Sequence, residues 1–384
     1  MQRKEENMIT AVGMKNKATA QNFNKESVVD FFVEFEENKD IVILQLSDMQ
    51  IIDSAQQRYQ TRLTPEQYNY WVTENMDERC FNPIRETIES VKPDFIIISG
   101  DLVYGEFDDK GTSFTKFVDF MESFGILWAP VFGNHDNESK MGVDWQCRIL
   151  ESAEHCIFKQ RRLTGNGNYT VGIVQGTRLK RVFYMLDSNG CGSISDVSMA
   201  NGHSKSTPGF GDDQMKWIKS SAKKIKTTYP DTKLSFVFHI QTDIFKEAYS
   251  KYGFTGSGTN ENPINIDEMT NRADGDLGYI GADLKNEWDK SNEVYDMMKK
   301  LGVDSVFVGH EHANNASVVY DGIRFQYGQK SSTYDRARYR LEDGTIEASF
   351  IPIGTPIIGG TAFCLSQEDA SIKNVYIYNC KNCI

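Results

Sequence analysis

The sequence lacks the features that place a protein in a membrane or on nucleic acid. No stretch approaches the apolar length that spans a bilayer, and the polar N-terminal residues contain no apolar core of a secretory signal. The formal net charge of −12 leaves no excess of Lys and Arg for a nucleic-acid surface. We therefore expect a cytoplasmic protein that binds neither membrane nor nucleic acid.

Cysteine is scarce, and its number is odd. Seven Cys scattered through 384 residues do not form the pattern of a disulfide framework, so we expect mostly reduced thiols. Cys380 and Cys383 form a CxxC pair near the C-terminal end, without a second pair at the spacing of a zinc site. We favour a plain tail for this pair, with a metal or redox site as the alternative.

The amount of apolar sequence predicts one large domain. Hydrophobic residues make up 39% of the chain, which also contains five Trp, and this is enough for a sizeable core. Residues 1–25 are too polar to pack and are expected to be a flexible lead. Residues 26–384 show no break in composition and are expected to form a single domain. Its Gly- and Asn-rich insert at about 253–282 is either a lid or a disordered loop.

Strand-like and helix-like segments alternate over the first three hundred residues. Apolar, β-branched runs at 41–46 and 94–99 predict buried strands, and helical spacing of apolar residues predicts a helix over roughly 82–91. From about residue 318 onward the pattern is one of strands and turns. This order predicts a layered α/β fold with mixed sheets.

Several strand-like runs end in residues that bind metal ions. The clearest is 127–132, which leads into Gly133 and then Asn134, His135 and Asp136; the Gly permits a sharp turn. Because open α/β sheets place their sites at the carboxyl ends of the strands, the residues at these ends are expected to converge. The candidate ligands are Asp48, Asp101, Asn134, His239, His310 and His312.

Oxygen and imidazole ligands without thiolates suit Mn, Fe or Zn. Six ligands are too many for one tetrahedral ion and about right for two, which together would hold a phosphate and a bridging hydroxide. His135, not needed as a ligand, would be the general acid for the leaving oxygen. Any single turn of this kind has an ordinary structural explanation. However, four of the six His lie in these motifs, which favours a common site.

The order of these motifs resembles that of the calcineurin-like metallophosphoesterase superfamily over roughly residues 40–330. The resemblance implies a four-layer α/β/β/α sandwich of two mixed sheets with a dinuclear metal centre. Within it, Asp48 and His312 would bind the first ion, and Asp101 would bridge. The ligands of the second ion would be Asn134, His239 and His310, and His135 would donate a proton or contact phosphate.

Two positions affect this comparison. The first motif is usually Asp-x-His, and here Gln50 occupies the place of the His, where it could coordinate weakly through its oxygen. The second motif, Gly-Asp-Leu-Val-Tyr from Gly100 to Tyr104, is similar to that of purple acid phosphatases, whose Tyr binds ferric iron and which also lack the first-motif His. Tyr104 is therefore the expected additional ligand, with a hydrogen-bonding or lining role as the alternatives.

The resemblance implies a phosphoesterase for a small phosphorylated substrate, with phosphomonoesters ahead of phosphodiesters. One alternative is a phosphodiesterase or nucleotidase, and another is a non-catalytic protein-binding scaffold with a degraded metal site. Outside the motifs, Arg336, Arg338 and Arg340 form a cluster. This cluster could bind a substrate phosphate through an Arg fork, or it could be the solvated face of a strand. We favour the solvated face.

Overall fold

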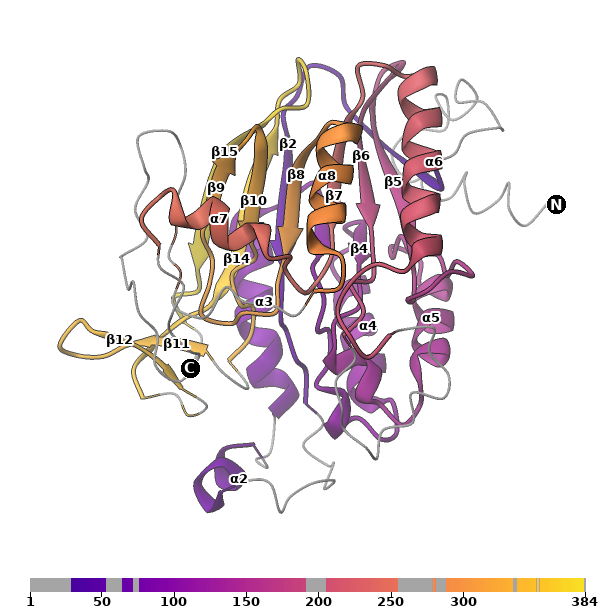
Figure 1. The fold of residues 1–384 in the computed structure, drawn as a ribbon. Helices are drawn as coiled ribbons and strands as arrows, with labels where there is room; N and C mark the ends of the chain where they lie inside the picture. The colour runs from indigo at the N-terminus through magenta and orange to yellow at the C-terminus, as the bar shows by residue number, and fades with distance from the viewer. Residues whose placement is uncertain are drawn as a thin grey trace.

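A computed structural model describes most of the chain (Figure 1). The described residues are 29–52, 64–71, 76–190, 205–254, 278, 280, 288–333, 337–349, 351 and 353–382. The expected flexible lead at 1–25 and most of the expected insert at 253–282 lie outside these residues.

Five strands form one sheet, in the order β15-β14-β2-β3-β4. Their bounds are β2 (Ile41–Leu46), β3 (Phe95–Ile98), β4 (Trp128–Pro130), β14 (Gly359–Leu365) and β15 (Ile372–Asn379). The strands β2, β3 and β4 are parallel, whereas β14 is antiparallel to both β2 and β15. Almost every residue of β2 and β3 is buried, which explains their continuous apolar sequence.

Seven strands form a second sheet, in the order β1-β5-β6-β7-β8-β10-β9. Their bounds are β1 (Phe31–Phe35), β5 (Tyr169–Gln175), β6 (Arg178–Met185), β7 (Lys233–Val237), β8 (Val303–Val308), β9 (Ser317–Tyr320) and β10 (Ile323–Tyr327). The strands β6, β7, β8 and β10 run parallel, while the pairs β5–β6 and β9–β10 are antiparallel. Both large sheets are therefore mixed, as the sequence predicts.

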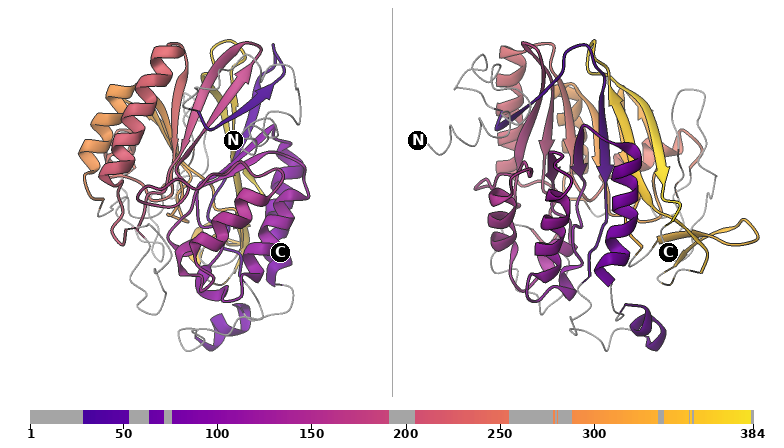
Figure 2. Two further views of the ribbon diagram at one scale, coloured as in Figure 1. Left: turned by 90° about the vertical axis from the view of Figure 1, so that its right-hand side faces the viewer. Right: turned by 180° about the vertical axis from the view of Figure 1, so that it is seen from behind.

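Helices cover the outer face of each large sheet, as the left view of Figure 2 shows. The side chains of α3 (Met76–Val91), α4 (Thr112–Glu122) and α5 (Val143–Ser152) share a core with the five-stranded sheet. Those of α6 (Asp212–Thr228), α7 (Ile244–Ser250) and α8 (Ser291–Leu301) share a second core with the seven-stranded sheet. Within the described part of the chain, no helix is long and apolar enough to cross a membrane.

The two sheets pack against each other through their inner faces. Phe307 of β8 stacks on Phe363 of β14, with ring centroids 4.8 Å apart and an interplanar angle of 17°. Gln45 of β2 donates to the Val308 carbonyl oxygen of the other sheet at 2.9 Å. These contacts complete the four-layer α/β/β/α sandwich that the family resemblance implies.

A third, three-stranded sheet was not predicted. It contains β11 (Ala337–Arg340), β12 (Ile346–Ser349) and β13 (Thr355–Ile357), all antiparallel. Arg338 of β11 is fully buried and donates to the Ala313 carbonyl oxygen at 2.9 Å. The solvated-face interpretation is therefore wrong at this residue, because its guanidinium is part of the interior; Arg336 lies outside the described residues.

Helix α3 begins earlier than the sequence predicts, so that Pro83 lies inside it. Proline has no N–H, which removes the helical hydrogen bond to the carbonyl oxygen of Arg79. The Thr333 hydroxyl donates to this oxygen at 3.2 Å. A hydrogen bond from a distant segment thus satisfies the carbonyl oxygen that the proline leaves without its helical donor.

The cysteines follow the prediction with one exception. Cys80, Cys147, Cys156 and Cys364 are free thiols. Cys380 is disulfide-bonded, and its partner lies outside the described residues. The interpretation of the CxxC segment as a plain tail is therefore wrong at Cys380.

Candidate metal centre

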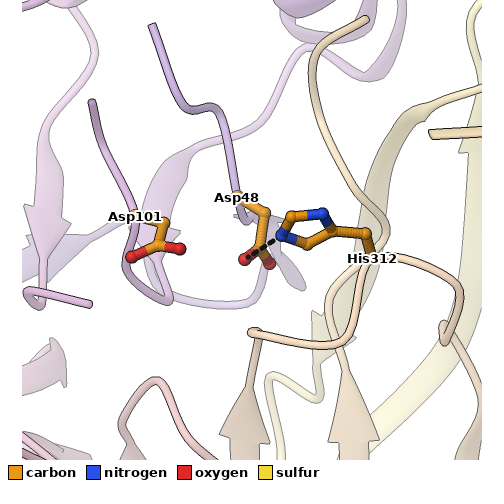
Figure 3. A group of neighbouring side chains, drawn as sticks. All are labelled: Asp48, Asp101 and His312. Carbon is orange, nitrogen blue, oxygen red and sulfur yellow. Dashed lines mark ion pairs between the residues drawn. The ribbon is translucent and has the colours of Figure 1, made fainter. Parts of the chain in front are cut away.

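The predicted ligands lie just beyond strands of both large sheets. The residues Asp48, Asp101 and Asn134 follow β2, β3 and β4, whereas His239 follows β7 and both His310 and His312 follow β8. Asp48, Asp101 and His312 each offer a ligand atom within 4.8 Å of the other two. Figure 3 shows these three side chains, with the imidazole pointing at the Asp48 carboxylate.

The turns that carry these residues have an unusual backbone. Asp48, Gln50, Asp101 and His310 have φ values of 50°, 46°, 52° and 76°, in the left-handed region that residues with a side chain seldom adopt. Such a conformation costs on the order of 1–3 kcal/mol per residue and occurs often at functional sites. Main-chain hydrogen bonds hold these turns together, among them one from Gln50 N–H to the Asp101 carbonyl oxygen at 2.9 Å.

Glycine is required at two of these turns because the site is crowded. A Cβ at Gly133 would overlap the Asp101 side chain, and one at Gly309 would lie 2.7 Å from Asp48 Oδ2. Gly133 does not have a positive φ. The sequence argument that this Gly permits a sharp turn therefore needs correction, since its role is to leave room for Asp101.

His239 is fully buried between two oxygen ligands. Its Nε2 lies 3.3 Å from Asp101 Oδ2 and 3.2 Å from Asn134 Oδ1. Its Nδ1 lies 2.8 Å from the Ser99 carbonyl oxygen, which can only accept, so Nδ1 must carry a proton. When the ring is neutral, this tautomer presents the Nε2 lone pair to the two oxygens, as a metal-binding His does.

His310 and His312 complete the cluster. His310 Nδ1 lies 3.0 Å from Asn134 Oδ1, and its main-chain N–H donates to both carboxylate oxygens of Asp48 at 3.1 Å. His312 Nε2 lies 3.4 Å from Asp48 Oδ1, with 9% of its side chain exposed. The structure thus brings all six candidate ligands that lie in the strand-end motifs into one cluster.

The donor set fits a cation. Carboxylate and amide oxygens face imidazole nitrogens at 3.0–3.4 Å, and acceptor atoms this close repel one another unless a proton or a metal ion lies between them. Oxygen and imidazole donors are the ligands of Mn, Fe and Zn. The residues present therefore fit the metal ions that the sequence predicts.

The pKa values show how the charges of the His and Asp side chains offset one another when no metal ion is bound. Burial lowers the pKa of His239, but the carboxylates of Asp101 and Asp48, together with the Ser99 carbonyl oxygen, raise that pKa to about 9. Burial also lowers the pKa of His310, to about 3, with the charge of His239 adding to the effect. Burial raises the pKa of Asp101, yet the charges of His239 and His135 bring it well below the usual range. In the metal-free site, a proton on His239 therefore takes the place of a cation.

The candidate proton donor, His135, lies in the short 3₁₀ helix His135–Glu138. Its Nδ1 lies 2.8 Å from Glu138 Oε2, and its main-chain N–H donates to Asp101 Oδ1 at 3.0 Å. Glu138 was not singled out from the sequence, although its position three residues after the His was a usable signal. Asp136, in the same turn, accepts main-chain N–H groups, including that of Gly133 at 2.7 Å.

Tyr104 lies beside this His and is 8% exposed. Its ring stacks on that of His135, with centroids 4.3 Å apart and an interplanar angle of 22°. The stack holds the imidazole plane and is compatible with a lining role. The role of Tyr104 as a metal ligand stays a prediction.

Gln50 is oriented by a residue that the sequence did not indicate. Lys330 Nζ donates to Gln50 Oε1 at 3.0 Å, and Gln50 Nε2 donates to Asp101 Oδ2 at 3.2 Å. The oxygen that was proposed to coordinate weakly is therefore bonded to the lysine. The two residues are separated by 280 positions in sequence, and no local pattern links them.

Comparisons with known proteins identify the family of this chain. The sequence model described as calcineurin-like phosphoesterase matches residues 41–314. Phosphatase DCR2 of Saccharomyces cerevisiae is 24% identical over 60% of this chain and 38% of its own length. The "Probable inactive purple acid phosphatase 28" of Arabidopsis thaliana is 31% identical over 69% of this chain and 65% of its own length. The chain thus spans less than two thirds of each relative.

A solved structure of a dimetal phosphatase from Danio rerio is also similar, at 9% identity. The match covers 89% of this chain and 99% of that one, with a TM-score of 0.42. The family match covers the motifs that carry all six candidate ligands of the strand ends. The chain belongs to the calcineurin-like phosphoesterase family, and its relatives include proteins named as purple acid phosphatases.

Proposed function

We propose that this protein is a dinuclear-metal-dependent phosphoesterase that hydrolyses small phosphomonoesters. The observation that carries this proposal is the convergence of buried acceptor atoms from the ends of both sheets, with His239 at the centre between Asp101 and Asn134. Membership of the family supports the reaction class. The preference for monoesters rests on the similarity to purple acid phosphatases.

In this proposal, each residue of the site has a role in metal binding or in proton transfer. Asp48 and His312 would hold one ion, and Asn134, His239 and His310 the other, with Asp101 between them. When bound, the ions would supply positive charge to the phosphate and activate a water molecule as the nucleophile. His135 would protonate the departing alkoxide oxygen. Its contact with Glu138 at 2.8 Å holds the ring in one tautomer and orientation for that transfer.

A non-catalytic scaffold is the second candidate. Gln50 stands where the family usually has a ligand His, and the Arabidopsis relative is named as inactive. Metal content separates the two candidates, because a scaffold with a degraded site would bind few ions or none. A phosphodiesterase or nucleotidase is the remaining enzymatic alternative, and the choice of ester substrate tests it.

The test uses the full chain loaded with iron or manganese and given an aryl phosphate monoester or the matching diester. We expect monoester turnover, and we expect Asp101→Asn to lose both bound metal and activity because this carboxylate lies between the two ligand groups. Asp30→Asn is the control: it also removes a largely buried carboxylate, but one that pairs with Arg161 at 2.6 Å. The control should keep its metal.

The outcomes discriminate between the candidates. Diester preference would favour the phosphodiesterase, and absence of bound metal in the wild type would favour the scaffold. Full activity in Asp101→Asn would contradict the bridging role. Equal loss in Asp101→Asn and Asp30→Asn would show that the effect is one of folding.

A further inference from the structure

Lys330 is a buried lysine beside the candidate metal centre, with 2% of its surface exposed. It follows β10, in a segment that pairs with the residues around Asp48. Ser331 N–H donates to the Ser47 carbonyl oxygen at 2.9 Å, and the Ser332 hydroxyl donates to the Met49 carbonyl oxygen. The segment that follows Lys330 is therefore bonded to the main chain immediately before and after Asp48.

The Lys330 side chain contacts the same turn. Its Nζ donates to the Asp48 carbonyl oxygen at 2.8 Å and to Gln50 Oε1 at 3.0 Å. A lysine ammonium has only donors, so the atom of Gln50 that faces it must be the amide oxygen. The amide nitrogen of Gln50 then faces Asp101 Oδ2 at 3.2 Å, as a donor to the carboxylate.

This arrangement has two consequences for a cation at Asp48 and His312. The Gln50 oxygen, which would be a ligand, is held by the lysine. In addition, the positive charge of the ammonium lies against the main chain of Asp48, where a second positive charge is repelled. Both consequences weaken this subsite relative to the one at Asn134, His239 and His310.

We propose that Lys330, by holding the Gln50 oxygen and placing a positive charge beside Asp48, makes the Asp48–His312 subsite the weaker of two metal subsites. The inference rests on the proposed function, because it assumes that the site binds two ions. Lys330 is a positioning residue and not a ligand. The subsite formed with Asn134, His239 and His310 fills first, and the subsite beside Lys330 fills second.

The test is a titration of the metal-free full chain with Mn²⁺ alone. Calorimetry and electron paramagnetic resonance are the two readouts of this titration. The wild type is expected to bind two ions in separate steps, the second at least about tenfold weaker. Isolated Mn²⁺ should be seen up to one equivalent, and coupled pairs only beyond it. Neither readout depends on turnover.

Two variants separate the two consequences. Lys330→Met removes the charge and releases the Gln50 oxygen, so the second step should tighten by about tenfold. Lys330→Gln removes the charge but keeps an N–H donor, so it should tighten the second step by less. Having two variants keeps the test valid where one of them does not fold.

Lys180→Met is the matched control. Lys180 is 8% exposed and donates to two main-chain oxygens, those of Gln367 and Glu368, away from the predicted ligands. It should leave both binding steps unchanged. Any of three outcomes would overturn this inference and leave the proposed function intact. The wild type could bind both ions equally well, the second step could be unchanged in both Lys330 variants, or Lys180→Met could shift that step as much as they do. A wild type that binds no metal would overturn the inference and the proposed function together.

Discussion

At the residue scale, the proton on His239 is the feature with the clearest measurable consequence. Its pKa of about 9 in the metal-free protein lies above the usual value of 6.5, because Asp101, Asp48 and the Ser99 carbonyl oxygen together outweigh the effect of burial. A raised pKa in the folded state means that the charged imidazole stabilises the fold. This contribution is complete below pH 6.5 and is lost as the pH rises through about 9.

Metal binding at pH 7 should therefore release a proton from His239, because a ligand imidazole must be neutral. Calorimetry of Mn²⁺ binding in buffers of different ionisation enthalpy measures this release, which we expect to be about one proton for this residue. His239→Gln should lose the release together with most of the affinity. Binding without any proton release in the wild type would contradict the raised pKa of His239.

Tyr104 gives the second prediction at this scale. If it binds a ferric ion, the iron-loaded protein should absorb visible light through phenolate-to-iron charge transfer, and Tyr104→Phe should abolish the band while keeping the ring stack on His135. Absorption spectra of both proteins provide the measurement. Tyr169→Phe, which removes a buried hydroxyl bonded to the Pro130 carbonyl oxygen at 2.7 Å, is the control and should keep the band. A colourless, fully iron-loaded and active wild type would rule out the ligand role.

At the scale of elements, the turns between the strands and the ligands require the backbone of one turn to lie against a ligand side chain of another. The turn after β4 brings Gly133 against Asp101, and any Cβ there would overlap the carboxylate. We expect Gly133→Ala to displace Asp101 and to reduce bound metal by at least about tenfold, because misplacing a ligand or its supporting residues typically costs this much. Elemental analysis of the purified variant measures the loss.

Gly322→Ala is the control for this substitution. Gly322 lies in the hairpin between β9 and β10, with φ of 78° and no heavy atom near the position of a Cβ. Its replacement should cost on the order of 1 kcal/mol of stability through backbone strain and leave bound metal unchanged. Normal metal content in Gly133→Ala would show that the turn can relax around Asp101.

At the scale of the whole molecule, the site exists only where the two sheets meet. Phe363→Ala removes a buried ring that stacks on Phe307 of the other sheet. We expect the free energy of unfolding to fall by about 3–5 kcal/mol, as for other buried Phe-to-Ala changes. Chemical denaturation of the metal-free protein measures it.

Val319→Ala serves as the control for this prediction, because Val319 is 39% exposed at the edge strand β9. It should change the free energy of unfolding by less than about 0.5 kcal/mol. Metal ions should restore part of the stability of Phe363→Ala, since ions that bind only the folded state stabilise it. A Phe363→Ala protein as stable as Val319→Ala would mean that the stack between the sheets contributes little.

The sequence alone determined the fold class and the chemistry of the ligands. Apolar runs such as 41–46 form strands in which almost every residue is buried, and this local pattern can be read without a structure. The Asp, Asn and His ligands lie in short motifs directly after these strands, so their chemistry can also be read from the local sequence. The rule that strand ends meet at one edge of a sheet predicts that the ligands of each sheet lie together. The meeting of the two ligand groups depends on the packing of the two sheets.

Only the tertiary structure decided how these residues are held. The bond from Lys330 to Gln50 joins positions 280 residues apart, and the bond from Thr333 to the Arg79 carbonyl oxygen of α3 joins positions 254 residues apart. Neither partner carries a local signal, since hydrogen bonds of this kind depend on where two surfaces meet after folding. The burial of Arg338 and the third sheet have the same origin. Sequence patterns report the neighbours of a residue along the chain, whereas its contacts across the core are determined by packing.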